Sequence, residues 1–144
     1  MIWLLMVYLI LPIPLVELDT RPVVHIPKDL SDFMTKTAFN CMIKLQTSSI
    51  MVKRFFEFQL PDNEASKKFL YCVSYETYLA DEDGHMSEAL LRLFDGSEHA
   101  EEVQKVFESC NKIKTKSPVR TIFEVANCFY KNSPVVLGPD LVRY

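Results

Sequence analysis

The sequence has few glycines, no cluster of basic residues and a small negative net charge, and each shortage argues against a class of protein. Only 3 of the 144 residues are glycine, against 8 prolines. Because small β-proteins need glycine in their turns and bulges, this composition favours packed helices joined by short turns. The formal net charge is -3, and no run of Lys and Arg is interleaved with aromatic residues, so a nucleic-acid partner is not expected.

The sequence also lacks the short motifs of many enzymes and metal sites. It contains no Gly-x-Ser-x-Gly, no His-Glu-x-x-His and no glycine-rich phosphate loop. Its cysteines do not form the close pairs typical of zinc sites. Residues 81–84 form an acidic, glycine-terminated segment, but its glycine does not stand where an EF-hand requires it. We therefore expect no enzymatic activity, no metal and no cofactor.

The N-terminal segment is strongly apolar. Residues 1–16 contain no charged side chain and are interrupted by two prolines. Such a run is too short and broken to span a bilayer comfortably, but it fits the apolar core of a secretory signal peptide. No Lys or Arg precedes it and no small-x-small cleavage signature is obvious, so an uncleaved anchor is the alternative. We expect a signal peptide at residues 1–18, with the cleavage site left open, and a single secreted domain at residues 19–144.

Secretion changes the interpretation of the cysteines. An even number of cysteines in an oxidising compartment predicts disulfides, and four cysteines allow three pairings. The four are Cys41, Cys72, Cys110 and Cys128.

Hydrophobic periodicity predicts about six helices in one domain. The predicted helices cover residues 29–45, 50–58, 67–83, 86–94, 100–113 and 118–130. The last has the clearest start, because Ser117 can cap the helix and Pro118 suits its first position.

Three segments stand out from this helical pattern. Residues 50–58 are apolar nearly all round, so they are either deeply buried or part of a cavity wall, and burial without a cavity is the commoner case. Residues 21–27 hold two prolines and predict an extended lead-in. The tail, residues 134–144, is too hydrophobic to be a solvated end.

The spacing of the cysteines resembles that of the insect odorant-binding proteins of the pheromone-binding and general-odorant-binding type. Six-cysteine members have two further cysteines, which would fall here at Lys68 and Val119. Those two pair with each other in that family, so their joint absence resembles the four-cysteine Minus-C branch. The resemblance implies that Cys41 pairs with Cys72 and Cys110 with Cys128.

The resemblance also implies a fold and a function. The expected fold is an all-α, compact bundle of about six helices around an apolar pocket. The expected function is that of a secreted carrier, which binds odorants or pheromones non-covalently and transports them in extracellular fluid. The partners would be a small apolar ligand and an olfactory receptor, with no stable membrane insertion and a monomeric or weakly dimeric state.

Apolar residues on helices that must face one another are the candidates for ligand contact, although each could equally be ordinary core. Tyr75, Tyr78 and Tyr130 could offer a hydroxyl to the ligand. His85, next to Asp83, is the candidate pH sensor, with a solvated surface histidine as the alternative. The ligand-contact candidates are Phe55, Val73, Met86, Leu90, Leu93, Phe94, Val106, Phe107, Phe123, Ala126, Tyr130, Val136 and Leu137.

Two other functions remain open at this point. A secreted helical protein of the signalling or seminal-fluid type would act by binding another protein, and it predicts a large exposed apolar patch without a cavity. A membrane-active protein of the saposin kind predicts lipid-dependent binding, but its cysteine spacing would differ from this one.

Overall fold

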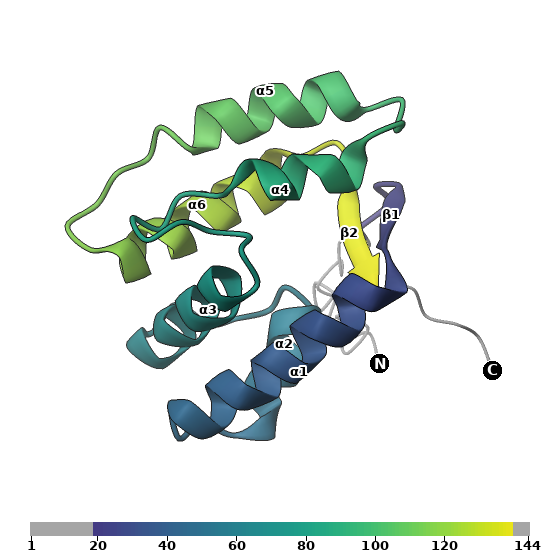
Figure 1. Cartoon of the computed structure of the whole chain (residues 1–144). Coiled ribbons are helices and arrows are strands. Elements are labelled where there is room, and N and C mark those ends of the chain that lie inside the picture. The colour runs from purple at the N-terminus through teal and green to yellow at the C-terminus, as the bar shows by residue number, and fades with distance from the viewer. Residues whose placement is uncertain (1–18, 140–144) are drawn as a thin grey trace, which may run out of the picture.

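The computed structural model describes residues 19–139, most of which are helical (Figure 1). Within them, no helix is both long and apolar enough to cross a bilayer. The signal peptide expected at residues 1–18 lies outside the described residues, as do residues 140–144 of the tail. The elements are β1 Val23–Ile26, α1 Lys28–Lys44, α2 Ser49–Phe56, α3 Glu64–Glu76, α4 Glu88–Leu91, the 3-10 turn η1 Arg92–Phe94, α5 Ala100–Cys110, α6 Pro118–Asn132 and β2 Val136–Pro139.

Side-chain caps fix the first turns of two long helices. The hydroxyl of Ser117 accepts a hydrogen bond from the backbone N–H of Arg120 at 3.2 Å, and Pro118 begins α6 as predicted. The side-chain oxygen of Asn63 accepts from the N–H of Ser66 at 2.8 Å and starts α3 one turn earlier than predicted. Each cap satisfies an N–H that has no partner within its own helix.

The central helix α3 also ends earlier than the predicted span of residues 67–83. It stops at Glu76, and Tyr78 adopts a positive φ of 61°. The N–H of Leu79 bonds to the carbonyl of Ser74 at 2.9 Å, and that of Tyr78 to Tyr75 at 3.1 Å. This is a Schellman motif. A tyrosine occupies the position that glycine usually takes, so no local signal in the sequence marks the end of this helix.

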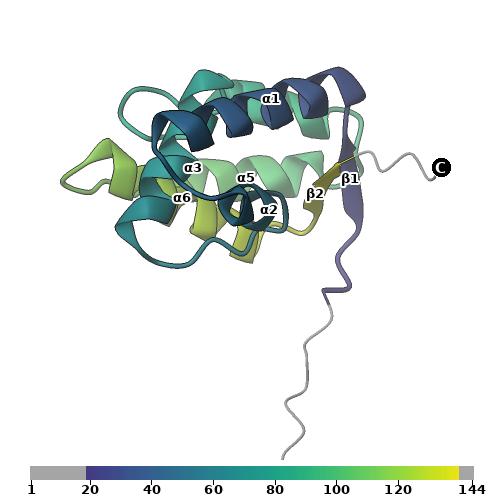
Figure 2. The same ribbon diagram turned by 90° about the horizontal axis from the view of Figure 1, so that it is seen from below.

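The extended lead-in and the apolar tail form a pair of parallel strands that the sequence did not predict. Val23 lies opposite Val136, and the two strands run side by side at one end of the helical bundle (Figures 1 and 2). They approach closely at Gly138, where a Cβ atom would lie 2.7 Å from a methyl carbon of Val23. The predicted all-α bundle is confirmed, with the addition of this small sheet, which is formed by the first and last described segments of the chain.

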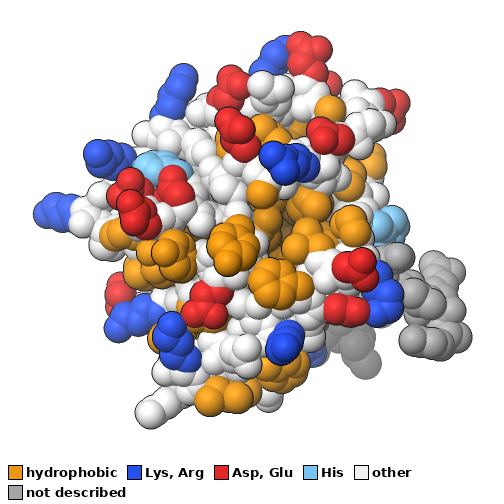
Figure 3. All heavy atoms as spheres, viewed as in Figure 1, with side chains coloured by type: hydrophobic (Ala, Val, Ile, Leu, Met, Phe, Trp, Pro, Cys, Tyr) orange, Lys and Arg blue, Asp and Glu red, His pale blue; other side chains and the backbone are white. Residues whose placement is uncertain are grey.

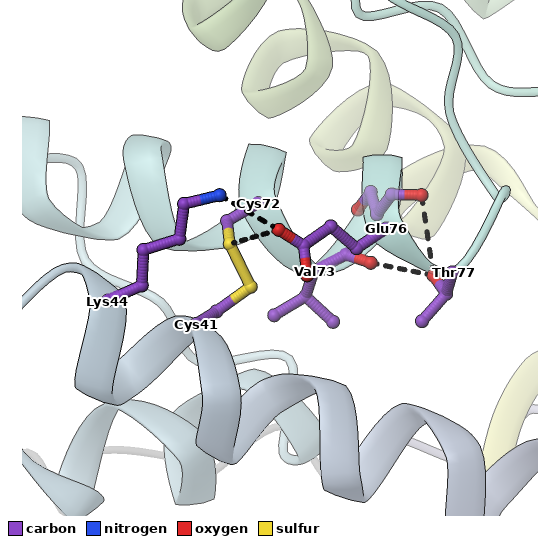
Figure 4. Close-up of a disulfide and its surroundings, with 7 residues drawn as sticks. Cys41, Lys44, Cys72, Val73, Glu76 and Thr77 are labelled. Atoms are coloured by element: carbon purple, nitrogen blue, oxygen red, sulfur yellow. Dashed lines mark hydrogen bonds and ion pairs between the residues drawn. A yellow bond between two sulfur atoms is a disulfide. The ribbon is translucent and has the colours of Figure 1, made fainter.

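The two disulfides have the expected pairing. Cys41 bonds to Cys72, which ties α1 to α3 (Figure 4). Cys110 bonds to Cys128, which ties α5 to α6. No cysteine among the described residues is free.

Each disulfide lies within its own hydrophobic cluster, and the two clusters define two halves that meet where α3 packs on α6. We call α1–α3 the N-terminal half and α4–α6 the C-terminal half. The N-terminal cluster consists of Ala38, Cys41, Met51, Val52, Phe69, Cys72 and Val73. The C-terminal cluster consists of Ala80, Met86, Leu90, Phe94, Val103, Phe107, Cys110, Ile122, Val125, Phe129 and Val135. Apart from the chain itself, no covalent bond in the described range joins the halves.

The acidic turn between the halves has a structural role. The carboxylate of Asp81 accepts hydrogen bonds from the N–H groups of Asp83 at 3.0 Å and His85 at 2.9 Å. Gly84 has a φ of 84°, and a Cβ atom there would lie 2.2 Å from the carbonyl oxygen of Pro118. Only glycine lets the turn pack this closely against the start of α6.

Candidate ligand-binding site

An apolar cavity of about 160 Å³ lies between the two halves. A cavity of about 150 Å³ is enough for a benzene-sized molecule, so a longer ligand must extend outwards or displace side chains. Figure 3 shows an apolar hollow in the region between α1, α3 and α4. The lining residues are Ile26, Met34, Phe55, Phe56, Phe58, Leu60, Leu70, Ser74, Leu79, Met86, Leu90, Ile122, Phe123, Ala126, Asn127, Phe129, Tyr130, Ser133, Val135, Val136 and Leu137.

None of these lining residues is charged, and four are polar: Ser74, Asn127, Tyr130 and Ser133. The hydroxyl of Ser133 donates to the carbonyl of Val135 at 2.6 Å. The hydroxyl of Tyr130 donates to Asp19 at 3.4 Å. Both are therefore already engaged by the protein.

Ser74 differs from the other two hydroxyl-bearing residues. It lies on the cavity wall and is only 9% exposed, and no side-chain hydrogen bond of Ser74 is found among residues 19–139. Asn127 is exposed, so its amide can bond to water instead. The buried side-chain oxygen that lacks any partner in the described range is Oγ1 of Thr47, which does not line the cavity. Of the three hydroxyl groups on the wall, that of Ser74 is therefore the one available to a ligand.

Aromatic rings form much of the wall on the α2 side. Phe55 and Phe56 meet edge to face with ring centroids 5.1 Å apart, and Phe55 also meets Phe69 at 6.0 Å. Phe58 stacks on Tyr130 of α6 at 5.0 Å, so this contact bridges the two halves. Such pairs add directional packing to the burial of their surfaces. The segment at residues 50–58 thus helps to wall a cavity, which was the less common of its two interpretations.

The structure brings most of the predicted ligand-contact residues together, although contact with a ligand stays a prediction. They reach the cavity from α2, α4, α6, β2 and the acidic turn. Those on the wall are Phe55, Met86, Leu90, Phe123, Ala126, Tyr130, Val136 and Leu137.

The remaining predicted residues do not line the cavity: Val73, Leu93, Phe94, Val106 and Phe107. Val73 is fully buried in the N-terminal cluster, and Phe94 and Phe107 are buried in the C-terminal one. Leu93 and Val106 pack, half-buried, against the C-terminal cluster. Helix α5 packs on α4 and α6, on the side away from α1 and α2, so its apolar face joins the core there (Figure 1).

Several wall residues were missed, for different reasons. Met34, Ile122 and Phe129 lie on apolar helix faces, but periodicity does not distinguish a core position from a cavity wall. Ile26 lies in the extended lead-in, for which no tertiary contact was expected, and Val135 directly precedes the two tail residues that were predicted. The missed residues also include Phe56, Phe58, Leu60, Leu70, Ser74, Leu79, Asn127 and Ser133.

His85 lies in the acidic turn and does not line the cavity. Its Nε2 atom is 3.0 Å from the carbonyl oxygen of Ile113, so Nε2 carries the proton in this bond, and its Nδ1 atom is 4.0 Å from the Asp81 carboxylate. A role in sensing pH stays a prediction. Tyr75 and Tyr78 are 46% and 75% exposed and lie off the wall, which leaves Tyr130 as the cavity tyrosine.

One group of potential metal ligands occurs among the described residues, around the Cys41–Cys72 disulfide. Glu76 lies 3.7 Å from the Cys72 sulfur, and Lys44 pairs with Glu76 at 3.1 Å (Figure 4). Both sulfurs are already bonded to each other and a cation occupies the carboxylate. The group is therefore a disulfide flanked by an ion pair, without ligands to spare for a metal.

The model of the PBP/GOBP family matches residues 25–132, which is most of the chain. The chain belongs to this family. Its two disulfides agree with the four-cysteine type of odorant-binding protein. A comparison with curated proteins finds no significant match.

Solved structures of insect odorant-binding proteins share the fold of this PBP/GOBP family member. One from Drosophila melanogaster has 15% identity and a TM-score of 0.62, over 74% of this chain and 93% of that one. One from Locusta migratoria has 22% identity and a TM-score of 0.60, over 76% and 86%. A fatty acid binding protein from the oral disk of the blowfly Phormia regina has 18% identity and a TM-score of 0.61, over 75% and 95%.

Proposed function

We propose that the protein is a secreted carrier, which binds a small apolar molecule such as an odorant or pheromone in the cavity and transports it through extracellular fluid. The main support is the uncharged cavity between two halves, each of which contains its own disulfide. Family membership and the shared fold point the same way. The alternative, a helical protein that acts only through protein contacts, predicts no such cavity.

The composition of the wall favours a neutral ligand. An ionised carboxylate in an apolar cavity loses its hydration, and no lining residue carries a compensating positive charge. An alcohol, ester or aldehyde avoids this cost, and its oxygen can hydrogen-bond to Ser74. Alcohols should therefore bind more tightly than fatty acids of equal length at neutral pH. Fatty acids belong in the comparison because one structural neighbour is named for binding them.

The test is displacement of a fluorescent apolar probe from the oxidised, secreted protein by long-chain alcohols, esters, fatty acids and small aromatics. Ala126→Trp, on the cavity wall, should weaken probe binding by at least about tenfold, because its ring fills the space that the ligand needs. Ala89→Trp is the matched control, since Ala89 is exposed on α4 and does not line the cavity.

The variant Ser74→Ala tests whether the ligand carries an oxygen that hydrogen-bonds to this residue. It should reduce binding of the alcohols by about 1 kcal/mol, the typical net value of one hydrogen bond, and leave hydrocarbons unchanged. Saturable binding that is equally strong in the Ala126→Trp variant would place the ligand elsewhere. No binding by a demonstrably folded protein would favour the protein-interaction alternative.

A further inference from the structure

The C-terminal end of α6 is completed by a side chain from the other end of the chain. The carbonyl of Tyr130 would normally accept from the residue four positions on, which is Pro134 and has no N–H. Arg21 takes that place, since its Nη1 atom donates to the carbonyl oxygens of Tyr130 and, at 3.0 Å, of Ser133. A cation at this position also interacts favourably with the helix dipole.

Asp19 holds the guanidinium of Arg21 in place. Its two carboxylate oxygens accept from Nε at 3.0 Å and from Nη2 at 2.7 Å, in the forked geometry that fixes both groups in one plane. The same carboxylate accepts from the backbone N–H of Arg21 at 3.1 Å and from the hydroxyl of Tyr130 at 3.4 Å. The pair thus makes two hydrogen bonds to Tyr130 of α6 and one to Ser133, which directly follows the helix.

Arg21 also contacts the cavity wall through an aromatic ring. Its guanidinium carbon lies 4.8 Å from the ring centroid of Tyr130, whose ring stacks on Phe58. Both aromatic residues line the cavity. The position of Arg21 is therefore coupled to the contact between the two halves on this side.

The chain beyond Arg21 continues directly into the strand pair. The carbonyl of Pro22 accepts from the N–H of Val136 at 3.0 Å, and β1 then pairs with β2. Val136 and Leu137 of β2 line the cavity. This wall segment is thus held on α6 by Arg21 and on β1 by strand pairing, with no covalent link to the N-terminal half.

We propose that Asp19 and Arg21 form a clamp that keeps residues 133–137 against the cavity and so controls how fast the ligand leaves. Arg21 is the positioning residue, and it acts through the end of α6 without touching the ligand. The role in ligand release rests on the proposed carrier function. The effect on the mobility of residues 133–137 does not, so the two ideas can be tested separately.

Hydrogen exchange of the full secreted chain without ligand tests the clamp itself. In Arg21→Ala, the amides of residues 135–138 should exchange at least about tenfold faster, as expected for lost hydrogen bonds from a charged donor. The amides of α3 and α5 should keep their protection. Arg21→Lys should restore part of it, because a lysine supplies a cation but not the fork. Arg54→Ala, which removes an exposed arginine on α2, is the control and should change nothing.

Release of a fluorescent apolar probe, followed by stopped flow, gives the second measurement. Its dissociation rate should rise by at least about tenfold in Arg21→Ala, less in Arg21→Lys, and stay unchanged in Arg54→Ala. Unchanged exchange at residues 135–138, or an equal increase throughout the chain, would overturn the clamp. A wild-type protein that binds no probe would overturn the carrier function alone, because hydrogen exchange would still decide on the clamp.

Discussion

The two halves of the domain differ in how completely they cover their apolar side chains. In the C-terminal half, helices α4, α5 and α6 enclose a large cluster that includes the fully buried Val103 and Val125. In the described part of the chain, every exposed large hydrophobic residue lies at or before position 78. They are Val23, Phe33, Phe39, Ile43, Ile50, Phe58, Tyr75 and Tyr78.

This difference indicates which side of the cavity adjusts to a ligand. The C-terminal half supplies α6 and β2 to the wall but keeps α5 entirely for its own core. The N-terminal half has a smaller cluster and supplies the phenylalanines of residues 55–58. Regions with fewer buried contacts open at lower free energy. We therefore expect the N-terminal half to become more ordered when the cavity is filled.

The largest expected effect comes from removing the centre of the smaller cluster. Phe69 has no exposed surface, so Phe69→Ala should lower the free energy of unfolding by about 3–5 kcal/mol through lost burial and a residual cavity. Phe39→Ala is the control, because Phe39 is 44% exposed, and it should change stability by about 0.5 kcal/mol at most. Urea denaturation measures both. Equal effects of the two would show that the N-terminal cluster is not an independent source of stability.

Removing each disulfide separately compares the halves directly. Replacing both cysteines of either disulfide by serine should lower the free energy of unfolding by about 2–4 kcal/mol. The pair at Cys41 and Cys72 spans 31 residues and the pair at Cys110 and Cys128 spans 18. Removing the disulfide that closes the longer loop should therefore lower the free energy of unfolding by about 0.5 kcal/mol more than removing the other. A larger loss for the C-terminal pair in urea denaturation would mean that packing outweighs loop length.

A smaller effect is expected from a cation that bridges the halves. The ammonium of Lys67 lies 5.5 Å from the ring centroid of Phe123 on α6 and pairs with Asp62 at 2.9 Å. Lys67→Ala should lower the free energy of unfolding by about 0.5–1 kcal/mol, the usual range of an accessible cation–π contact. Lys68→Ala, at the exposed neighbouring residue, should have no measurable effect. A similar loss in both variants would point to helix propensity as the cause.

The smallest expected effect is that of mild acid on the clamp. Hydrogen bonding from the Arg21 side chain lowers the pKa of Asp19 from 3.8 to about 2. Because this folded-state pKa is depressed, the contribution of Asp19 is present above the unfolded value and is lost only as the pH falls through about 2. Release of a bound probe should therefore change by less than about twofold through this clamp between about pH 7 and pH 5.

If acid in that range triggered release of the probe, a group outside the clamp would also control ligand release. The predicted sensor His85 would then be the residue to replace, with His85→Gln expected to abolish the pH effect. Asp19→Asn serves as the matched variant for the clamp, since it keeps the shape of the side chain but removes the charge.

Local signals in the sequence predicted some parts of the molecule well. The cap at Ser117 and Pro118 placed the start of α6 correctly, because it depends on adjacent residues alone. The resemblance to the odorant-binding proteins supplied the disulfide pairing, which spacing by itself left open among three arrangements. The end of α3 was missed because Tyr78 adopts the left-handed conformation without the usual glycine.

The sequence by itself determined the helical segments, the apolar faces and an even set of cysteines, since periodicity and capping act within a few residues. Only the tertiary structure decided that β1 pairs with β2, that Phe94 and Phe107 pack in the core while Phe58 and Tyr130 line the cavity, and that Arg21 completes α6. Each of these depends on segments distant in the chain meeting in space, and an apolar pattern alone does not specify which partner a buried face will find.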